Sequence, residues 1–348
     1  MKTNILTPDQ QSIARDIQAQ LVNSNSVLMH CHPSPDPDSL GSVLATKFAL
    51  ESMGKSVTVI SGDSKIPQAF MHMPGAQDVL PQNYVETDLT QFDTFIALDS
   101  GSPDMISRKQ KVTFPPQSNP NLKVIVIDHH ATNTGYGNVN LLATQYISTT
   151  EILFDVFQEW NVSLTKEIAV NLYAGLFTDS GGFRYNKVTD HTFYMASVLA
   201  EIDPQMLDVI TQMENSNAPA SVDFLGLALT QKKVFQSNSG KGSFVISYVN
   251  QEDIKRIGLT PDDWSGNLVC NMLKAVVGWN VAVLMIEELP GVVKCSFRTR
   301  DQVLFDVSKV AVALGGGGHK AAAGATVKKP ILEAVDEVAR VIESTLFA

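Results

Sequence analysis

Hydrophobic and polar positions along residues 1–203 form two alternating patterns. Short apolar runs at 27–32, 57–60, 94–98 and 124–127 predict buried strands. Longer segments with apolar residues at helical spacing predict helices at 39–53, 149–160, 166–177 and 192–202. Because strands that alternate with helices are joined by crossover connections, the pattern predicts an α/β domain with a mainly parallel sheet flanked by helices.

The pattern changes after residue 203. A polar, Asn-rich stretch follows, and we expect a linker at 204–221. Beyond it the pattern predicts strands at 243–249, 281–287 and 292–297, and helices at 222–234, 265–276, 303–314 and 331–346. We therefore expect residues 222–348 to form a smaller mixed α/β domain, with the active site in the cleft between the two domains.

Length and composition agree with a globular protein of two domains. The chain has 348 residues, of which 44% are hydrophobic and 18% charged, and this composition excludes disorder as the main state. Its 26 Lys and Arg residues against 36 Asp and Glu residues give a net charge of −10. Because a negative protein repels long polyanions, we expect no binding of long duplex nucleic acid, whereas a short nucleotide could enter a locally basic cleft.

No segment predicts a membrane anchor or an export signal. The longest apolar run, 275–286, is interrupted by Asn280 and is shorter than the ~20 residues that span a bilayer. Charged and Gln residues interrupt the first twenty positions, which therefore lack the apolar centre of a secretory signal. We expect a cytoplasmic protein with no membrane partner, in which three cysteines are buried thiols: Cys31, Cys270 and Cys295.

Acidic and imidazole side chains gather where the predicted strands end. In an open parallel sheet, functional groups collect beyond the carboxyl ends of the strands. The runs at 27–32, 94–98 and 124–127 lead into such residues, and a further Asp follows the helix at 166–177. We therefore expect one cluster that contains His32, Asp36, Asp38, Asp99, Asp128, His129, His130 and Asp179.

Five carboxylates in one cluster require a positive partner. Their mutual repulsion and the cost of burying them both amount to several kcal/mol at any plausible dielectric. Two divalent cations would supply the charge, and the mixture of imidazole and carboxylate ligands favours Mn²⁺, with Mg²⁺, Co²⁺ and Zn²⁺ as alternatives. A single Asp at a strand end has another interpretation, as an N-cap or turn residue. The joint pattern favours a centre with two metals.

A second candidate site follows the predicted helix at 303–314. Four consecutive glycines leave backbone N–H groups open to an anion, which a Cβ would obstruct. A helix C-cap followed by a turn is the alternative interpretation. Positive donors accompany the run, since His319 follows it directly and Arg298 lies at the end of a predicted strand.

Four ordered motifs resemble those of the DHH phosphoesterase superfamily. They are His32-x-x-Pro35-Asp36-x-Asp38-x-x-Gly41-Ser42, Ala97-Leu98-Asp99-Ser100, Asp128-His129-His130 and Thr178-Asp179-Ser180-Gly181. The tail is similar to the DHH-associated C-terminal domain, through Ser296-Phe297-Arg298, Gly315-Gly316-Gly317-Gly318-His319 and Ala321-Ala322-Ala323-Gly324. The two-domain size looks most like the stand-alone oligoribonuclease and 3′-phosphoadenosine 5′-phosphate (PAP) phosphatase subgroup.

The resemblance implies a specific set of metal ligands. One metal would be held by His32, Asp36 and Asp99, and the other by Asp38, Asp99, His129 and Asp179. Asp99 would bridge the two metals, and a hydroxide shared by them would attack phosphorus. His130 would lie beside the substrate phosphate, and Asp128 would orient the histidines.

The resemblance also implies substrate contacts outside the metal motifs. Implied contacts with phosphate or base are Arg298, Gly315, Gly316, Gly317, Gly318 and His319, and Arg184 is a further candidate. Two features depart from the family pattern: Thr299-Arg300 follows Arg298 where Ser is more frequent, and Ser180-Gly181-Gly182 varies the usual motif. Both departures concern substrate selection more than metal binding.

The activity implied is hydrolysis of short RNA oligonucleotides to mononucleotides and of PAP to AMP. The expected partners are thus short single-stranded RNA or small nucleotides, because a long strand would need an extended basic track. A phosphodiesterase for cyclic dinucleotides or their linear products would use the same metals. An alternative of another class is a nucleotide-binding regulator without turnover. The sequence does not decide the oligomeric state, and a homodimer is one possibility.

Overall fold

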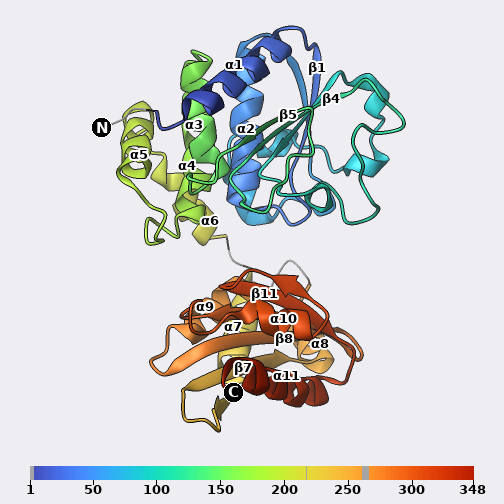
Figure 1. Ribbon diagram of the computed structural model, residues 1–348, viewed down its shortest axis with the longest axis vertical. Helices are drawn as coiled ribbons and strands as arrows, with labels where there is room; N and C mark the ends of the chain where they lie inside the picture. Colours follow the sequence, from blue (N-terminus) through green and yellow to red (C-terminus); the bar gives the residue numbers. More distant parts are fainter. Residues whose placement is uncertain (1–3, 217, 261–265) are drawn as a thin grey trace. The chain divides into compact units, whose positions relative to one another are not determined.

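The computed structural model describes residues 4–216, 218–260 and 266–348, and the chain forms two compact units, Met1–Ser216 and Asn217–Ala348 (Figure 1). The division falls within the stretch at 204–221 that we expected to be a linker. However, this stretch contains the helix α6 (Leu207–Glu214), which belongs to the first unit. The helix packs against the first unit because two of its apolar side chains, Val209 and Ile210, are buried in the core of that unit.

The first unit contains a parallel sheet of five strands in the order β2-β1-β3-β4-β5. The strands are β1 (Ser26–His30), β2 (Ser56–Ile60), β3 (Thr94–Leu98), β4 (Lys123–Asp128) and β5 (Val139–Leu142). The first four confirm the predicted strands to within about two residues at each end. The fifth was not predicted, because a four-residue edge strand gives too short an apolar pattern.

The two faces of this sheet are covered differently. Ile96 and Leu98 of β3 face a core shared with the α-helices, whereas Phe95 and Ala97 face a separate apolar core. The second core includes residues of the short 3₁₀ helices η3 (Tyr84–Glu86) and η4 (Leu89–Gln91). The α-helices of the first core are α1 (Pro8–Val22), α2 (Pro37–Ser52), α3 (Thr149–Glu159), α4 (Lys166–Asp179), α5 (Asp190–Ile202) and α6.

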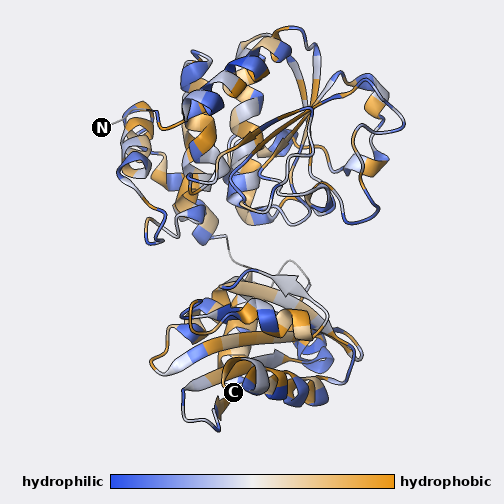
Figure 2. Ribbon diagram, viewed as in Figure 1, coloured by the Kyte–Doolittle hydropathy of each residue, from blue (hydrophilic) through white to orange (hydrophobic). Residues whose placement is uncertain are grey.

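The second unit contains a mixed sheet in the order β10-β11-β9-β8-β7-β6, in which only β7 and β8 pair in parallel. The strands are β6 (Lys232–Gln236), β7 (Ser243–Val249), β8 (Trp279–Leu289), β9 (Val292–Thr299), β10 (Gly317–Gly318) and β11 (Ala322–Val327). Alternate residues of β8 face two cores, with α10 (Val307–Ala313) and α11 (Ile331–Leu346) on one side and α7 (Pro219–Thr230) and α9 (Gly266–Lys274) on the other. Figure 2 shows the hydrophobic strands of both sheets.

Three predicted helices of this unit have different bounds. The helix expected at 222–234 ends at Thr230, because Lys232–Gln236 pairs with β7 and Phe235 stacks on Phe244. The helix expected at 303–314 begins only at Val307, where Asp306 caps it. The helix expected at 265–276 ends at Lys274, and residue 265 lies outside the described residues.

The remaining helix of the second unit is α8 (Gln251–Ile257), which the sequence analysis did not predict. It is short, and Asn250 caps it by accepting a hydrogen bond from the Asp253 N–H. Within the described ranges, no helix combines the length and the apolar character that crossing a membrane requires.

Candidate metal centre

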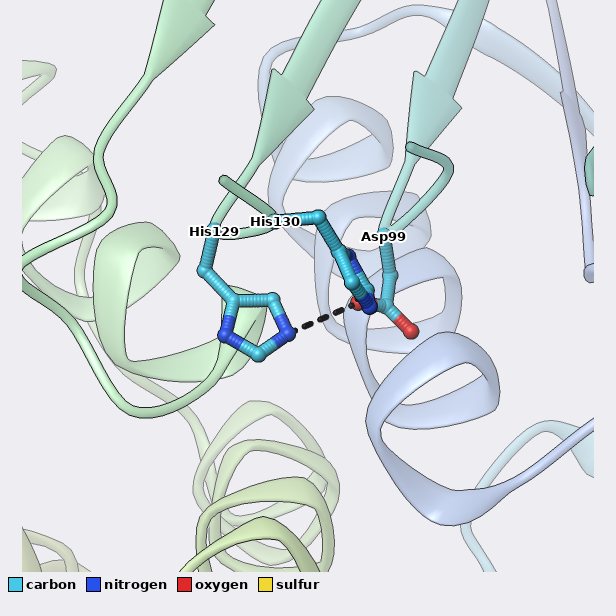
Figure 3. A group of neighbouring side chains, drawn as sticks. All are labelled: Asp99, His129 and His130. Atoms are coloured by element: carbon cyan, nitrogen blue, oxygen red, sulfur yellow. Dashed lines mark ion pairs between the residues drawn. The ribbon is translucent and has the colours of Figure 1, made fainter. Parts of the chain in front are cut away.

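The predicted cluster forms at the carboxyl edge of the parallel sheet. His32 lies just beyond β1, Asp99 directly follows β3, and His129 and His130 directly follow β4. Figure 3 shows Asp99 and the two histidines on the ends of neighbouring strands, with the His129 ring pointing toward the Asp99 carboxylate. Two helices contribute the other members: α2 contributes Asp36, its N-cap, and Asp38, and α4 ends at Asp179.

The loop between β1 and α2 is held by its own polar groups. The Asp36 Oδ1 atom caps α2 by accepting a hydrogen bond from the Ser39 N–H at 2.9 Å. The Ser39 hydroxyl in turn accepts from the His32 N–H at 3.1 Å. Pro37 occupies the first helical position, where the missing N–H has no cost. Asp36 therefore has both roles that we considered for an Asp at a strand end: it is a helix N-cap, and it is a member of the cluster.

Asp99 lies at the centre of the cluster and has an unusual backbone. Its φ of 53° is left-handed, a conformation that Asp tolerates better than most residues. The side chain is only 4% exposed, and its two oxygens face different histidines. Oδ1 lies 3.4 Å from His129 Nε2, and Oδ2 lies 3.9 Å from His32 Nε2. This arrangement suits a carboxylate that bridges two cations.

Two three-residue groups present their ligand atoms close together. One group is His32, Asp36 and Asp99, and the other is Asp38, His129 and Asp179; within each group the ligand atoms lie within 4.8 Å of one another. The His32 Nε2 atom is 3.2 Å from Asp36 Oδ2. The His129 Nε2 atom is 4.0 Å from Asp38 Oδ2 and 3.6 Å from Asp179 Oδ2. The structure thus brings together the side chains that the resemblance implies for two metals.

His130 belongs to a third such group, with Asp99 and His129, but its Nδ1 atom already has a partner. That atom lies 2.8 Å from Asp128 Oδ1, and Asp128 Oδ2 accepts a hydrogen bond from Asn133 Nδ2 at 2.8 Å. Of the two adjacent histidines, His130 is the one in this hydrogen bond with Asp128. Its side chain is 36% exposed, and the contact with Asp128 uses Nδ1.

Burial and mutual repulsion both act on the charged groups of the cluster. Burial and the neighbouring carboxylates Asp38 and Asp36 raise the pKa of Asp99 and of Asp179 well above the ordinary value. Burial also lowers the pKa of His129, which disfavours its charged form. Asp36 differs: burial raises its pKa, but His32 and the Ser39 N–H outweigh burial and lower it. A cation placed among these groups would relieve the repulsion.

The histidine rings fit a metal as well. The Nδ1 atoms of His32 and His129 are buried and have no hydrogen-bond partner within the described part of the chain. The Nε2 atoms face the carboxylates at the distances given above. Neutral imidazole and carboxylate together form a donor set that suits Mn²⁺ and related divalent cations.

The glycine run of the second unit differs from the open loop that we expected. The Gly315 and Gly316 N–H groups donate to the carbonyls of Val312 and Ala311, so they end α10 and are not open to an anion. Gly317 and Gly318 form β10 and pair with β11. A Cβ on Gly316 would lie 2.2 Å from the Gly324 carbonyl oxygen, so glycine is needed here for close approach between strands.

The remaining predicted substrate residues lie in both units. Arg298 is on β9, between Ala282 of β8 and Ala322 of β11, and its Nη1 atom donates to the Phe297 carbonyl at 2.8 Å. His319 is exposed in the turn between β10 and β11. Arg184 is exposed in the first unit, and its Nε atom donates to the Gly181 carbonyl.

The sequence analysis missed two contributors to this site and, in the same unit, a buried histidine between two carboxylates. Thr149 and Thr150 hydrogen-bond to Asp38 and Asp99, and His191 lies between two carboxylates of α3. The available signal for the threonines was Ser148-Thr149-Thr150 at the start of a predicted helix, which reads only as a cap. His191 has no spacing motif, because its carboxylate partners are about 40 positions away.

Comparisons with known proteins agree with this geometry. Residues 26–176 match the DHH family, N-terminal domain, and residues 241–346 match the DHHA1 domain. The bifunctional oligoribonuclease and PAP phosphatase NrnA of Thermus thermophilus is 28% identical over 88% of this chain and 88% of its own length. The probable bifunctional oligoribonuclease and PAP phosphatase NrnA of Streptococcus mutans is 26% identical over 89% of this chain and 92% of its own.

A solved structure supports the fold. An exopolyphosphatase-related protein from Bacteroides fragilis superimposes with a TM-score of 0.83, at 22% identity, over 96% of both chains. At this identity the likeness shows the fold alone. It extends over both units and agrees with the α/β class predicted from the sequence.

Proposed function

The chain belongs to the DHH superfamily, with a DHH N-terminal domain followed by a DHHA1 domain, and on this premise we propose that it is a metal-dependent phosphoesterase. Its proposed substrates are short RNA oligonucleotides and PAP, the two substrate classes in the names of its relatives. The observation that carries the proposal is the pair of ligand groups at the sheet edge, in which Asp99 faces both His32 and His129.

We assign the proposed ligands to two metal positions, starting from the groups of neighbouring side chains described above. His32, Asp36 and Asp99 would hold one divalent cation, and Asp38, His129, Asp179 and Asp99 the other, with Mn²⁺ as the expected metal. Two such cations supply the Lewis acidity that activates water and that neutralises charge on a phosphate. Asp99 would keep the two positions at a fixed spacing, because its buried backbone and side chain leave it little freedom.

His130 is the proposed contact for the substrate phosphate. Asp128, itself held by Asn133, binds the ring at Nδ1, and Nε2 of the partly exposed ring is the nitrogen proposed to contact the phosphate. Asp128 is fully buried, so any effect it has on the substrate would act through His130, to which it is hydrogen-bonded. Its proposed role is therefore to position His130, a narrower role than orienting both histidines.

The second unit is proposed to bind the rest of the nucleotide. Arg298 and His319 supply positive or hydrogen-bonding groups, and Gly317 and Gly318 let the chain come close to a ligand without a Cβ. Arg184, in the first unit two residues beyond Gly182, is a further proposed contact. Gly315 and Gly316 are proposed to shape this turn only, since their N–H groups are bonded within the chain.

The proposed partners are short single-stranded RNA and nucleotides, and no long duplex. The net charge of −10 supports small substrates, because a long strand needs an extended positive track. The three cysteines are free and buried, which agrees with the reducing cytoplasm that we propose as the compartment. A homodimer is the proposed assembly to test by light scattering.

One substrate panel tests the proposal. The purified chain is incubated with Mn²⁺ and, separately, with a 5′-labelled RNA dinucleotide, an RNA 24-mer, PAP and a cyclic dinucleotide. We expect rapid hydrolysis of the dinucleotide and PAP, slow hydrolysis of the 24-mer, and no turnover in excess chelator. The D128N variant is a second arm, in which the metal ligands are intact and His130 loses its charged partner.

The outcomes separate the alternatives. Preference for the cyclic dinucleotide would replace the proposed substrate while keeping the metal centre. Tight nucleotide binding with no turnover on any substrate would favour the non-catalytic regulator. Full activity in excess chelator would refute the metal-dependent chemistry.

A further inference from the structure

Two threonines at the start of α3 contact the carboxylates of the candidate metal centre. The Thr149 N–H donates to Asp38 Oδ2 at 2.8 Å, and its hydroxyl donates to Asp99 Oδ1 at 3.1 Å. Thr150 donates twice to Asp38 Oδ1, from its N–H at 3.0 Å and from its hydroxyl at 2.8 Å. All four residues are buried, so water does not compete for these hydrogen bonds.

The two carboxylate oxygens of Asp38 accept different numbers of hydrogen bonds. A carboxylate oxygen has two lone pairs, and Thr150 occupies both on Oδ1. Within the described part of the chain, Oδ2 accepts one hydrogen bond, from Thr149, and it is the oxygen that faces His129 Nε2. Only Oδ2 therefore keeps a lone pair for a cation, which would make Asp38 a ligand through one oxygen.

We propose that Thr149 and Thr150 are positioning residues that select Oδ2 of Asp38 as the metal ligand and set its spacing from Asp99. The inference rests on the proposed function, since it concerns how the chain presents ligands to a metal. Neither threonine needs to touch the metal or the substrate. Their effect is exerted through the carboxylates that they hold.

Local helix chemistry explains why these residues are available. The first N–H groups of a helix have no acceptor within the helix. The Ser148 hydroxyl satisfies the Glu151 N–H at 3.0 Å, which leaves the N–H groups of Thr149 and Thr150 for Asp38. The start of one helix thus supplies the hydrogen-bond donors that a buried carboxylate needs.

Close packing of α4 keeps this arrangement in place. A Cβ on Gly175 would lie 2.6 Å from the Thr150 methyl carbon and 2.7 Å from Asp38 Oδ1. The backbone of α4 therefore presses directly on the Thr150–Asp38 contact, and Thr150 has little room to rotate its hydroxyl away. Gly175 lies one helical turn before Asp179 on the same helix, so the contact and the ligand share one support.

The test replaces each hydroxyl by a methyl group of the same size. T149V and T150V keep both backbone N–H donors and remove only the side-chain donors. Mn²⁺ affinity is measured by isothermal titration calorimetry, and the environment of the bound Mn²⁺ by electron paramagnetic resonance. We expect 10- to 100-fold weaker Mn²⁺ binding, the usual effect of losing a group that orients a metal ligand, and for T150V a changed spectrum, because Oδ1 regains a free lone pair.

Two controls separate positioning from general stability. T149S and T150S restore the hydroxyl and should restore both affinity and spectrum. T46V is the matched control, because the Thr46 hydroxyl on α2 is buried without a hydrogen-bond partner in the described part of the chain. It should leave Mn²⁺ binding unchanged. If a Val variant does not fold, T149A and T150A remove the same hydroxyls with no new bulk and give the same comparison.

The results distinguish this inference from the function on which it rests. A wild-type chain that binds no Mn²⁺ would overturn the proposed function and this inference with it. Wild-type binding, with T149V and T150V equal to wild type in affinity and spectrum, would overturn the positioning role alone. Loss in the Val variants with recovery in the Ser variants would support it.

Discussion

The buried histidine of α5 makes the stability of this protein depend on pH in the alkaline range. His191 is 3% exposed and lies between two carboxylates of α3, with Nδ1 3.1 Å from Glu151 Oε1 and Nε2 3.0 Å from Asp155 Oδ1. Tyr146 and Thr192 also face this group: Tyr146 donates to Asp155 at 2.6 Å, and Thr192 donates to Glu151 at 2.9 Å. The histidine can donate to both carboxylates only when it is protonated.

The size of the effect follows from the pKa of His191. Burial lowers this pKa, but the hydrogen bonds to Asp155 and Glu151 outweigh burial and raise it from 6.5 to about 9. Because one pKa unit corresponds to about 1.4 kcal/mol, the charged ring stabilises the folded protein by about 3 kcal/mol. A raised pKa gives stability that is fully present below pH 6.5 and is lost as the pH rises through about 9.

The assay is urea unfolding at intervals between pH 6 and pH 10, in chelator so that metal binding does not contribute. We expect the free energy of unfolding of the wild-type chain to lose this contribution of about 3 kcal/mol across the window, and E151Q, which removes one of the two charged partners, to lose less. In that variant the pKa of His191 should fall and the loss should begin at lower pH. Titration of the His191 ring by NMR measures the pKa directly in the folded protein.

Equal pH dependence in the wild-type chain and E151Q would refute the reasoning, and so would an NMR pKa of His191 at or below 6.5. D190N is a suitable control, since Asp190 is an exposed neighbour of His191 in sequence and, among the described residues, makes no hydrogen bond or ion pair with the buried group. It should keep the wild-type dependence.

Three further predictions concern the proposed sites. D99A should lower kcat by orders of magnitude and reduce bound Mn²⁺, because both cations lose a ligand; near wild-type turnover with stoichiometric metal would contradict the bridging role. R298A and H319A should each lower kcat/KM on an RNA dinucleotide about 10- to 150-fold and affect a small activated phosphodiester much less; equal losses on both substrates would contradict a role in substrate binding. G175A should destabilise the chain by about 1–3 kcal/mol and weaken Mn²⁺ binding, because the new Cβ meets Thr150 and Asp38; unchanged melting and affinity would show that α4 shifts freely.

The strands of the first sheet and the cluster at their ends were predictable from the chain. Four strands have strong apolar runs. Three of them, β1, β3 and β4, lead into polar residues of the cluster. Parallel strands place such ends on one edge, so Asp99 and His129 had to be close. The pairing of Gly317 and Gly318 with β11 was less predictable, because glycines favour turns, caps and close approach alike.

Short and edge elements escaped the sequence analysis for a common reason. β5 and β6 lie at sheet edges and have one buried residue and none, respectively, so they lack the apolar run that marks the predicted strands. β6 is recognised only through its pairing with β7, and the stack of Phe235 on Phe244 is a contact between strands. The linker was likewise overestimated, since the apolar side of α6 finds its partner only in the folded first unit.

The proposed metal ligands could be predicted from the chain alone, because strand ends and residue types are local properties. The residues that hold these ligands in place became visible only in the folded structure. Thr149 and Thr150 reach Asp38 across more than 100 positions, and Gly175 closes that contact from a third helix. His191 meets Glu151 and Asp155 in the same way. Hydrogen bonds of this kind depend on distances of a few tenths of an ångström between separate elements, and only packing sets those distances.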